Sequence, residues 1–201
     1  MLKSLQVFIM ALAVFAATPA RAATQWQIDP AQSRLTFTAQ QGAEKFTGGF
    51  KNFAVDIMFS ADDLAHSKIT ATIDMAGVYA GSADRDAALP GRDWFNIKDF
   101  PQAVFTTNAI SPIVGIDGTE RVEHYFAEGV LTIRGISKPV RLPFTLKREG
   151  GKVRAQGEVT IMRNDFGVGQ GSFAGDSWVK YGVTIGVDIV ATEKTAEKTT
   201  R

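Results

Sequence analysis

The chain of 201 residues has no cysteine and only two histidines, His66 and His124, so thiolate and imidazole groups for metal binding or nucleophilic chemistry are scarce. The lack of cysteine excludes disulfides, thiolate metal sites and a cysteine nucleophile. Zinc sites normally gather several His or Cys ligands, so we expect no metal. No phosphate-binding loop, dinucleotide motif or nucleophile elbow is present, and we expect no catalytic residue.

Two polar motifs remain as candidate sites. Arg85-Asp86 lies in a long segment between two apolar runs, and Arg163-Asn164-Asp165-Phe166-Gly167 leads into a glycine-rich stretch. Arg85 has the donor geometry to hold a quinone carbonyl or a phosphate, but such pairs more often organise loops, and we favour that second interpretation. For the second motif we expect turn chemistry, with Gly167 and Gly169 at positive φ, because no helix or Lys-Ser/Thr pair follows.

The first 22 residues have the pattern of a secretory signal. Lys3 precedes an uncharged apolar run, Val7 to Ala17, and Ala20-Arg21-Ala22 places small residues at the cleavage site. The run is shorter than the roughly 20 residues that span a bilayer, which disfavours the alternative of a retained anchor. We therefore expect cleavage between Ala22 and Ala23 and a periplasmic protein.

Composition and charge narrow the class further. The chain is 45% hydrophobic and 21% charged, as in one globular domain, which we place at residues 23–190, and residues 191–201 form a polar tail. Removing Lys3 and Arg21 from 22 basic residues leaves 20 against 21 acidic ones. A net charge of −1 gives no reason to expect a nucleic-acid partner.

The elements that must position any site are strands. Apolar residues alternate with polar ones, which predicts antiparallel strands with one dry face. Helical pattern is limited to one turn at Ala61 to His66 and a short segment after Ser82, between the third and fourth strands. The run 46–59 would be roughly 46 Å long, which favours an elongated eight-stranded barrel over a sandwich. The eight expected strands are 33–40, 46–59, 68–79, 103–109, 127–133, 140–146, 153–161 and 179–189.

The expected inner face is uncharged and contains small residues in mid-strand, including Ala71, Ala103 and Gly157. An eight-stranded barrel is just wide enough to be filled by side chains or to hold one small ligand. Small residues favour a cavity, although phenylalanines from across the barrel are an alternative filling. A long uncharged cavity selects an apolar chain.

Four motifs in order resemble the YceI-like family: Trp26-x-Ile28-Asp29-Pro30-x-x-Ser33, Arg85-Asp86-x-x-Leu89 followed by Trp94-Phe95, Gly129 to Val140, and Arg163 to Gly171. The resemblance covers about Trp26 to Ile189 and implies a lipocalin-like, periplasmic barrel that binds a polyisoprenoid, with isoprenoid quinones and polyprenyl lipids among its guests. Gln40-Gln41 replaces a histidine of many members, and Trp94 replaces a common phenylalanine. These departures leave the head group of the guest open.

We therefore expect a non-catalytic carrier that holds an isoprenoid quinone or polyprenyl compound, needs no other cofactor and touches the inner or outer membrane transiently. An enzyme that modifies such a lipid at the barrel mouth and an outer-membrane barrel are the alternatives, and a homodimer is left open. The expected ligand contacts are Phe37, Phe53, Ile57, Ala71, Ile73, Met75, Arg85, Trp94, Phe95, Ala103, Phe105, Leu131, Phe144, Gly157, Ile161, Phe166 and Val183.

Overall fold

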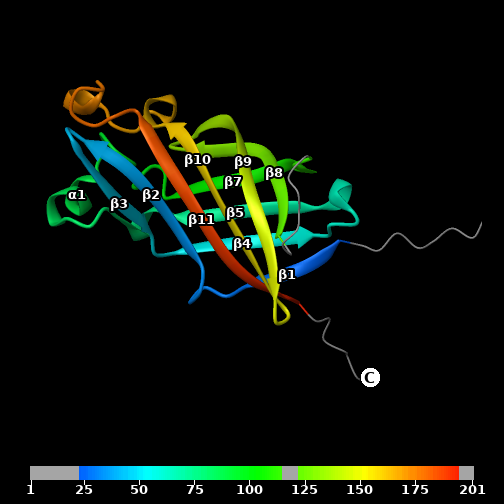
Figure 1. Ribbon diagram of the computed structural model, residues 1–201. Helices are drawn as coiled ribbons and strands as arrows, with labels where there is room; N and C mark the ends of the chain where they lie inside the picture. Colours follow the sequence, from blue (N-terminus) through cyan, green and yellow to red (C-terminus); the bar gives the residue numbers. More distant parts are fainter. Residues whose placement is uncertain (1–22, 115–121, 195–201) are drawn as a thin grey trace, which may run out of the picture.

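The computed structural model describes residues 23–114 and 122–194, which form an elongated β-barrel (Figure 1). The predicted signal segment 1–22 and residues 195–201 of the predicted tail lie outside the described residues. Among those that are described, no helix is long and apolar enough to cross a membrane.

All strands belong to one antiparallel sheet. Eight of them close into a ring in the order β1-β4-β5-β7-β8-β9-β10-β11, because β1 pairs with both β4 and β11. The other three, β2, β3 and β6, continue the wall beyond β11 toward the opposite end. The predicted eight-stranded antiparallel barrel is therefore confirmed. The strands are β1 (Thr24–Ile28), β2 (Arg34–Gln41), β3 (Glu44–Phe50), β4 (Phe53–Phe59), β5 (Lys68–Asp74), β6 (Val78–Tyr79), β7 (Gln102–Pro112), β8 (Val122–Ile133), β9 (Ile136–Glu149), β10 (Lys152–Met162) and β11 (Gly182–Glu193).

The predicted continuous strand over 46–59 is wrong, because the chain leaves the ladder at Lys51 and Asn52, between β3 and β4. The backbone of these two residues bonds to the neighbouring strand segment instead, with Lys51 N donating to Gly77 O (3.0 Å). The break changes which positions face inward. Phe46 and Phe50 line the interior in β3, whereas the odd-numbered positions do so in β4.

Two further strands change face in the same way. The predicted strand 68–79 is interrupted by a 3-10 turn at Met75–Gly77, after which Val78 is buried and Tyr79 is not. In β7 the register shifts between Thr107 and Ala109, so that Ile110 rather than Ala109 is buried. An irregularity of this kind moves every later side chain to the other face of the strand.

One end of the barrel is packed shut. Phe59, Tyr125 and Phe144 form its centre, with the Tyr125 ring 5.4 Å from that of Phe59 and 5.5 Å from that of Phe144. Burial raises the pKa of Tyr125, whose hydroxyl donates to Glu123 (2.5 Å). This is the end at which β1 begins and β11 finishes (Figure 1). β11 pairs with β1 as far as Glu193, beyond the predicted barrel end at residue 190.

The opposite end is covered by non-strand segments. Helix α1 (Ala83–Ala88) lies between β6 and β7, as predicted, and the Ser82 side chain caps it by accepting from Arg85 N. The 3-10 turns η3 (Arg163–Phe166) and η4 (Gly171–Phe173) belong to the connection from β10 to β11, and lie with α1 at this end (Figure 1). β11 starts at Gly182, later than the predicted 179, because this connection occupies the preceding residues.

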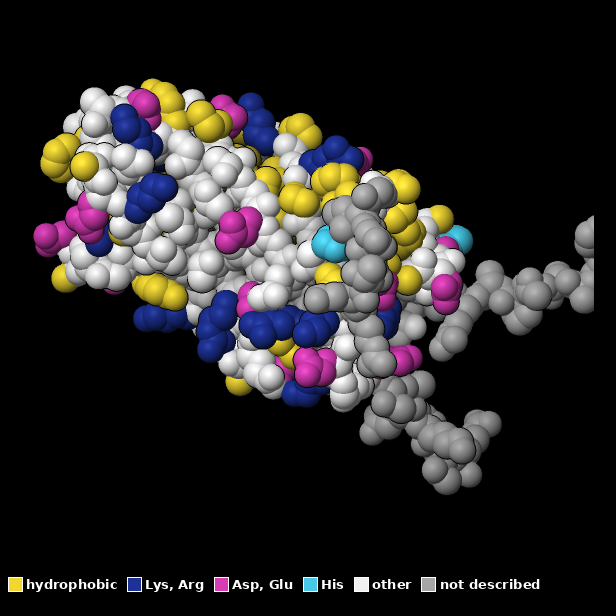
Figure 2. Space-filling view, viewed as in Figure 1, with side chains coloured by type: hydrophobic (Ala, Val, Ile, Leu, Met, Phe, Trp, Pro, Cys, Tyr) yellow, Lys and Arg dark blue, Asp and Glu magenta, His cyan; other side chains and the backbone are white. Residues whose placement is uncertain are grey.

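The outer surface is polar over much of its area. Figure 2 shows Lys, Arg, Asp and Glu side chains side by side over the lower part of one face. On adjacent strands β10 and β11, Arg154 Nε donates to Asp188 Oδ1 (2.7 Å), and this hydrogen bond lowers the pKa of the Asp188 carboxyl. Polar residues thus alternate outward with the apolar residues that face inward.

Candidate ligand-binding cavity

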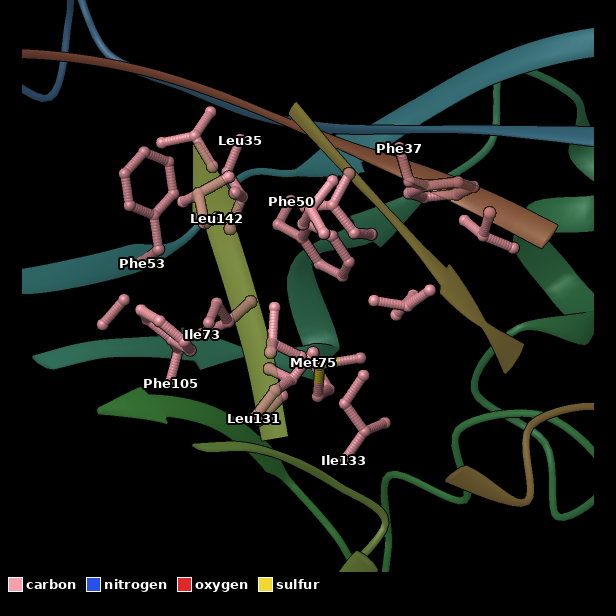
Figure 3. Close-up of a pocket in the computed structure, with 18 of the residues that line it drawn as sticks. Leu35, Phe37, Phe50, Phe53, Ile73, Met75, Phe105, Leu131, Ile133 and Leu142 are labelled. Carbon is pink, nitrogen blue, oxygen red and sulfur yellow. The ribbon is translucent and has the colours of Figure 1, made fainter. Parts of the chain in front are cut away.

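A cavity of about 460 Å³ runs through the interior of the barrel. Its walls are side chains from every long strand, and Figure 3 shows ten of them labelled, converging on a common space with no oxygen or nitrogen among their drawn side-chain atoms. The polar residues that line it are few: Gln41, Asp84, Arg85 and Arg163. A volume in this range with a nearly all-carbon wall is typical of a site for an apolar small molecule or chain.

The inner face of the barrel is incompletely packed along its middle. Leu35, Phe53, Leu131 and Val183 all line the cavity, yet each keeps an intermediate exposure rather than being buried. In a close-packed interior, neighbouring side chains would cover these surfaces. The phenylalanines therefore do not fill the interior. Buried side chains pack into one cluster at the closed end and into two smaller ones, around Phe37 and around Ile73, beside the cavity.

All of the predicted ligand contacts except Gly157 line this cavity. Gly157 lies where β10 approaches β9 most closely, and a Cβ there would stand 2.4 Å from the Pro143 carbonyl oxygen. Its small size thus serves strand packing, and the expectation that it borders the ligand space is not met. Gly129 is similar, because a Cβ there would stand 2.3 Å from the Thr106 carbonyl oxygen.

The structure adds lining residues that the sequence pattern did not single out. Phe46 and Phe50 were hidden by the strand break before Phe53, because a regular period of two places them on the outer face. Leu35 and Leu142 were visible on the predicted inner faces and follow the same pattern as the residues chosen. Trp178, in the connection before β11, lines the cavity although it is 56% exposed, and no periodicity marks it.

Arg85 and Asp86 organise the loop, as we favoured, and Arg85 also faces the cavity. The Asp86 carboxylate accepts from Ala80 N (2.5 Å), and Arg85 Nε donates to Ala80 O (3.2 Å). Arg85 Nη1 donates to Gln41 Oε1 (3.4 Å), and the guanidinium lies over the Phe46 ring, 4.3 Å from its centroid. The residue therefore closes the wall between α1 and the β2–β3 turn and places a cation at this end of the cavity.

Arg163 holds the covering loop in place. The residue is 3% exposed, and its guanidinium donates to six backbone carbonyls: Lys180 O, Val168 O, Gly169 O, Phe173 O, Gly175 O and Val179 O. Burial lowers the pKa of Arg163. The expected turn chemistry is confirmed, since Gly167 and Gly169 have φ values of 64° and 82°.

Trp94 has a buried hydrogen-bond donor that no acceptor among the described residues pairs with. Its ring packs against Phe173 (centroids 5.1 Å apart) in the wall of the cavity. The indole Nε1 is buried and has no hydrogen-bond partner among the described residues. An enclosed donor without an acceptor is costly, so this atom marks a place where an acceptor on a bound molecule would be stabilised.

The acidic residues and histidines do not assemble into a metal site. Within residues 23–114 and 122–194, no three His, Cys, Asp or Glu residues are close enough to hold an ion. His66 Nδ1 lies 2.8 Å from Asp63 on the surface of the β4–β5 turn, away from the cavity.

Comparison with known proteins assigns the chain to a family by its sequence, and the fold agrees with that assignment. The family model described as "YceI-like domain" matches residues 26–191, and the chain belongs to this family. A UPF0312 protein of Pectobacterium carotovorum is 28% identical over 177 residues, which cover 84% of this chain and 88% of that protein. A UPF0312 protein of Photorhabdus laumondii is 33% identical over 103 residues, and that match spans only half of the relative.

Solved structures share the fold. Burkholderia cenocepacia BcnA has a TM-score of 0.76 and 31% identity, with 83% of this chain and 100% of BcnA covered. A YceI protein of Campylobacter jejuni has a TM-score of 0.60 and 26% identity, covering 73% of this chain and 84% of that one. A polyisoprenoid binding domain from Saccharophagus degradans has a TM-score of 0.65 over 85% of this chain and 99% of that one, and at 14% identity it shows a shared fold alone.

Proposed function

We propose that this protein is a periplasmic, non-catalytic carrier that holds a long isoprenoid chain in its barrel, either an isoprenoid quinone or a polyprenyl compound. The observation that carries the proposal is the apolar cavity, whose only polar lining residues lie at the end near α1 and Arg163. A chain with one polar head and a long apolar tail matches this distribution. The name of the Saccharophagus degradans neighbour, a polyisoprenoid binding domain, supports the same class of guest.

The energetics suit a carrier. Each methylene transferred from water to the cavity is worth about 0.8 kcal/mol, whereas transfer from a bilayer to the cavity is worth almost nothing. The protein would therefore exchange its guest with membranes rather than retain it irreversibly. This carrier role includes transient contact with the inner or outer membrane, and the predicted signal segment 1–22 supports export to the periplasm.

An enzyme that modifies the lipid at the barrel mouth is the rival function. The charged residues that line the cavity are Asp84, Arg85 and Arg163. The two arginines donate their hydrogen bonds to groups of the protein itself, such as Ala80 O and Gln41 Oε1 for Arg85 and Lys180 O for Arg163. Among the described lining residues, Asp84 is the one carboxylate, and neither a histidine nor a nucleophilic side chain lies with it. This arrangement supports binding and gives no route for proton transfer to a guest.

The test is to extract the purified mature protein with organic solvent and identify the extract by mass spectrometry. A carrier yields an intact isoprenoid lipid at up to one molecule per chain, and treatment with a chelator leaves that amount unchanged. Recovery of a product that differs chemically from the lipid supplied to the protein would favour the enzyme. An extract free of isoprenoid lipid would contradict the proposed guest.

A further inference from the structure

The barrel wall is interrupted between β9 and β10. These strands pair only from Lys152↔Glu149 to Gly157↔Phe144. Beyond that point β9 remains paired with β8 as far as Ile136, and β10 remains paired with β11 as far as Met162. The two strand pairs diverge toward the end that carries η3 (Figure 1). We call the opening between residues 136–143 and 158–162 the lateral slot.

The sequence of β9 explains why the β9–β10 ladder does not continue along the slot. Pro139 and Pro143 lack an N–H, and a proline within a sheet is tolerated where its nitrogen points away from the paired strand. Because the β8–β9 ladder is continuous, both nitrogens face β10, and two ladder donors are missing on that side. Gly157 then permits the last close contact, to the Pro143 carbonyl, before the strands separate.

The slot adjoins the cavity. It holds a pocket of about 220 Å³ between the two strands. Val140, Val159, Ile161 and Phe166 line this pocket, and the same four residues line the main cavity. Their apolar side chains are therefore the partition between the two spaces, and a chain passes from one to the other when these side chains move aside.

Two large apolar side chains are exposed on the strands that border the slot. Ile136 is 39% exposed and Met162 is 44% exposed, on opposite sides of the opening. Lys138, Arg141 and Asp165 also border it, with Arg141 held by Glu128 (2.9 Å).

We propose that the lateral slot is the passage through which the isoprenoid chain moves between a bilayer and the cavity, with Ile136 and Met162 inserted in the bilayer surface. This proposal rests on the proposed carrier function. A chain that moves sideways through the slot never exposes its full apolar length to water, which is unfavourable in proportion to the apolar area exposed. The rim carries both charge signs, so the contact depends on apolar insertion more than on anionic lipid.

Bridging the slot tests this directly, because the protein has no cysteine of its own. In Arg141→Cys/Thr160→Cys, the two thiols lie on the outer face of β9 and β10 across the slot, and a bis-maleimide joins them. The matched control, Thr145→Cys/Gln156→Cys, places the same bridge at a position where the strands are already paired. The measurement is the rate at which deuterated geranylgeraniol leaves phosphatidylcholine vesicles for the protein, followed by mass spectrometry.

We expect the bridge across the slot to slow transfer at least tenfold relative to the same variant without the bridge, with the amount bound at equilibrium unchanged. The control bridge should leave the rate unchanged. Equal transfer rates with and without the slot bridge would overturn the proposal and place the passage at the end of the barrel. If the unaltered protein binds no geranylgeraniol at equilibrium, the proposed function fails, which is a different result.

The rim residues provide a second measurement that does not depend on cross-linking. Ile136→Gln/Met162→Gln should slow transfer from vesicles several-fold without changing the lipid bound at equilibrium. Met58→Gln is the control, because Met58 is also 39% exposed but lies on β4, away from the slot. Transfer that is equally slow in both variants, or that is unchanged in the rim variant, would contradict insertion at the slot.

Discussion

The indole N–H of Trp94 is a hydrogen-bond donor enclosed in the wall of the cavity, beside Phe173 and close to Arg163. Burial of such a donor without an acceptor costs about 1–3 kcal/mol. A quinone carbonyl or a prenyl hydroxyl near this point would remove that cost. Trp94 is therefore a residue able to distinguish a guest with an acceptor from one without.

Trp94→Phe keeps an aromatic ring in the wall and removes the donor. We expect about tenfold weaker binding of an isoprenoid quinone, equivalent to about 1.4 kcal/mol, and unchanged binding of squalene, which has no acceptor. Lipid retained after gel filtration measures both. Trp178→Phe is the control, since that side chain lines the cavity but is 56% exposed. An equal loss for quinone and squalene would mean that Trp94 acts through packing alone.

Arg163 is also a single residue with a large expected effect, in this case on the stability of the protein. Replacing it with lysine exchanges a planar group with five donors for one with three, so several of the six carbonyls lose their partner in a buried place. Arg163→Lys should lower the free energy of unfolding by about 2–4 kcal/mol, measured by urea denaturation. Cleavage by trypsin after Lys180 should also become faster. A loss below 1 kcal/mol would show that the loop is held by other contacts.

At the scale of the elements, the period of two predicted an antiparallel barrel and most of the cavity lining. It missed β1, which closes the ring, whereas the predicted strand 33–40 is β2, outside the ring. It did not predict the breaks at Lys51, at Met75–Gly77 and after Thr107. Each break depends on bonds to another strand, such as Lys51 N to Gly77 O, and these are not local properties of the sequence. Phe46 and Phe50 were missed for that reason.

The divergence of β9 and β10 also belongs to this scale, and it has a local cause in two prolines. Pro143→Thr restores a donor beside the point where the ladder ends at Gly157↔Phe144. We expect the ladder to lengthen, with a gain of about 1 kcal/mol for the added bond and slower amide exchange at the new residue. Pro112→Thr, at the end of β7, is the control. An unprotected amide at position 143 would show that strand curvature, rather than the missing donor, keeps the slot open.

At the scale of the whole molecule, the barrel is closed at the Tyr125 end, capped at the α1 end and hollow between them. The residues that stabilise the fold and those that would bind a guest therefore lie at different positions along the barrel axis. The packed end provides the burial that a cysteine-free domain needs, and the middle leaves apolar surface uncovered for a guest. Substitutions of the same chemical type should therefore have opposite effects depending on where along the axis they fall.

Ala71→Leu tests that separation. Ala71 pairs with Val55 and Phe105 on β4 and β7, lines the cavity and is only half-buried, so a larger side chain extends into empty space. In the lipid-free protein we expect the melting temperature to hold or rise, by up to a few degrees, because new apolar contacts form. Bound lipid should fall sharply, because the leucine occupies space that the guest needs.

Two further alanine-to-leucine variants serve as controls for Ala71→Leu. Ala103 is 5% exposed and packed with Ile73 and Met75, so Ala103→Leu should overpack and cost about 1–3 kcal/mol. Ala54→Leu places the same change on the outer face of β4, where neither stability nor lipid content should move by much. Calorimetry of the delipidated proteins and mass spectrometry of their extracts measure both quantities. If Ala71→Leu lowers the melting temperature as Ala103→Leu does and leaves the bound lipid unchanged, the middle of the barrel is a packed core, and the carrier function that depends on its being hollow must be abandoned.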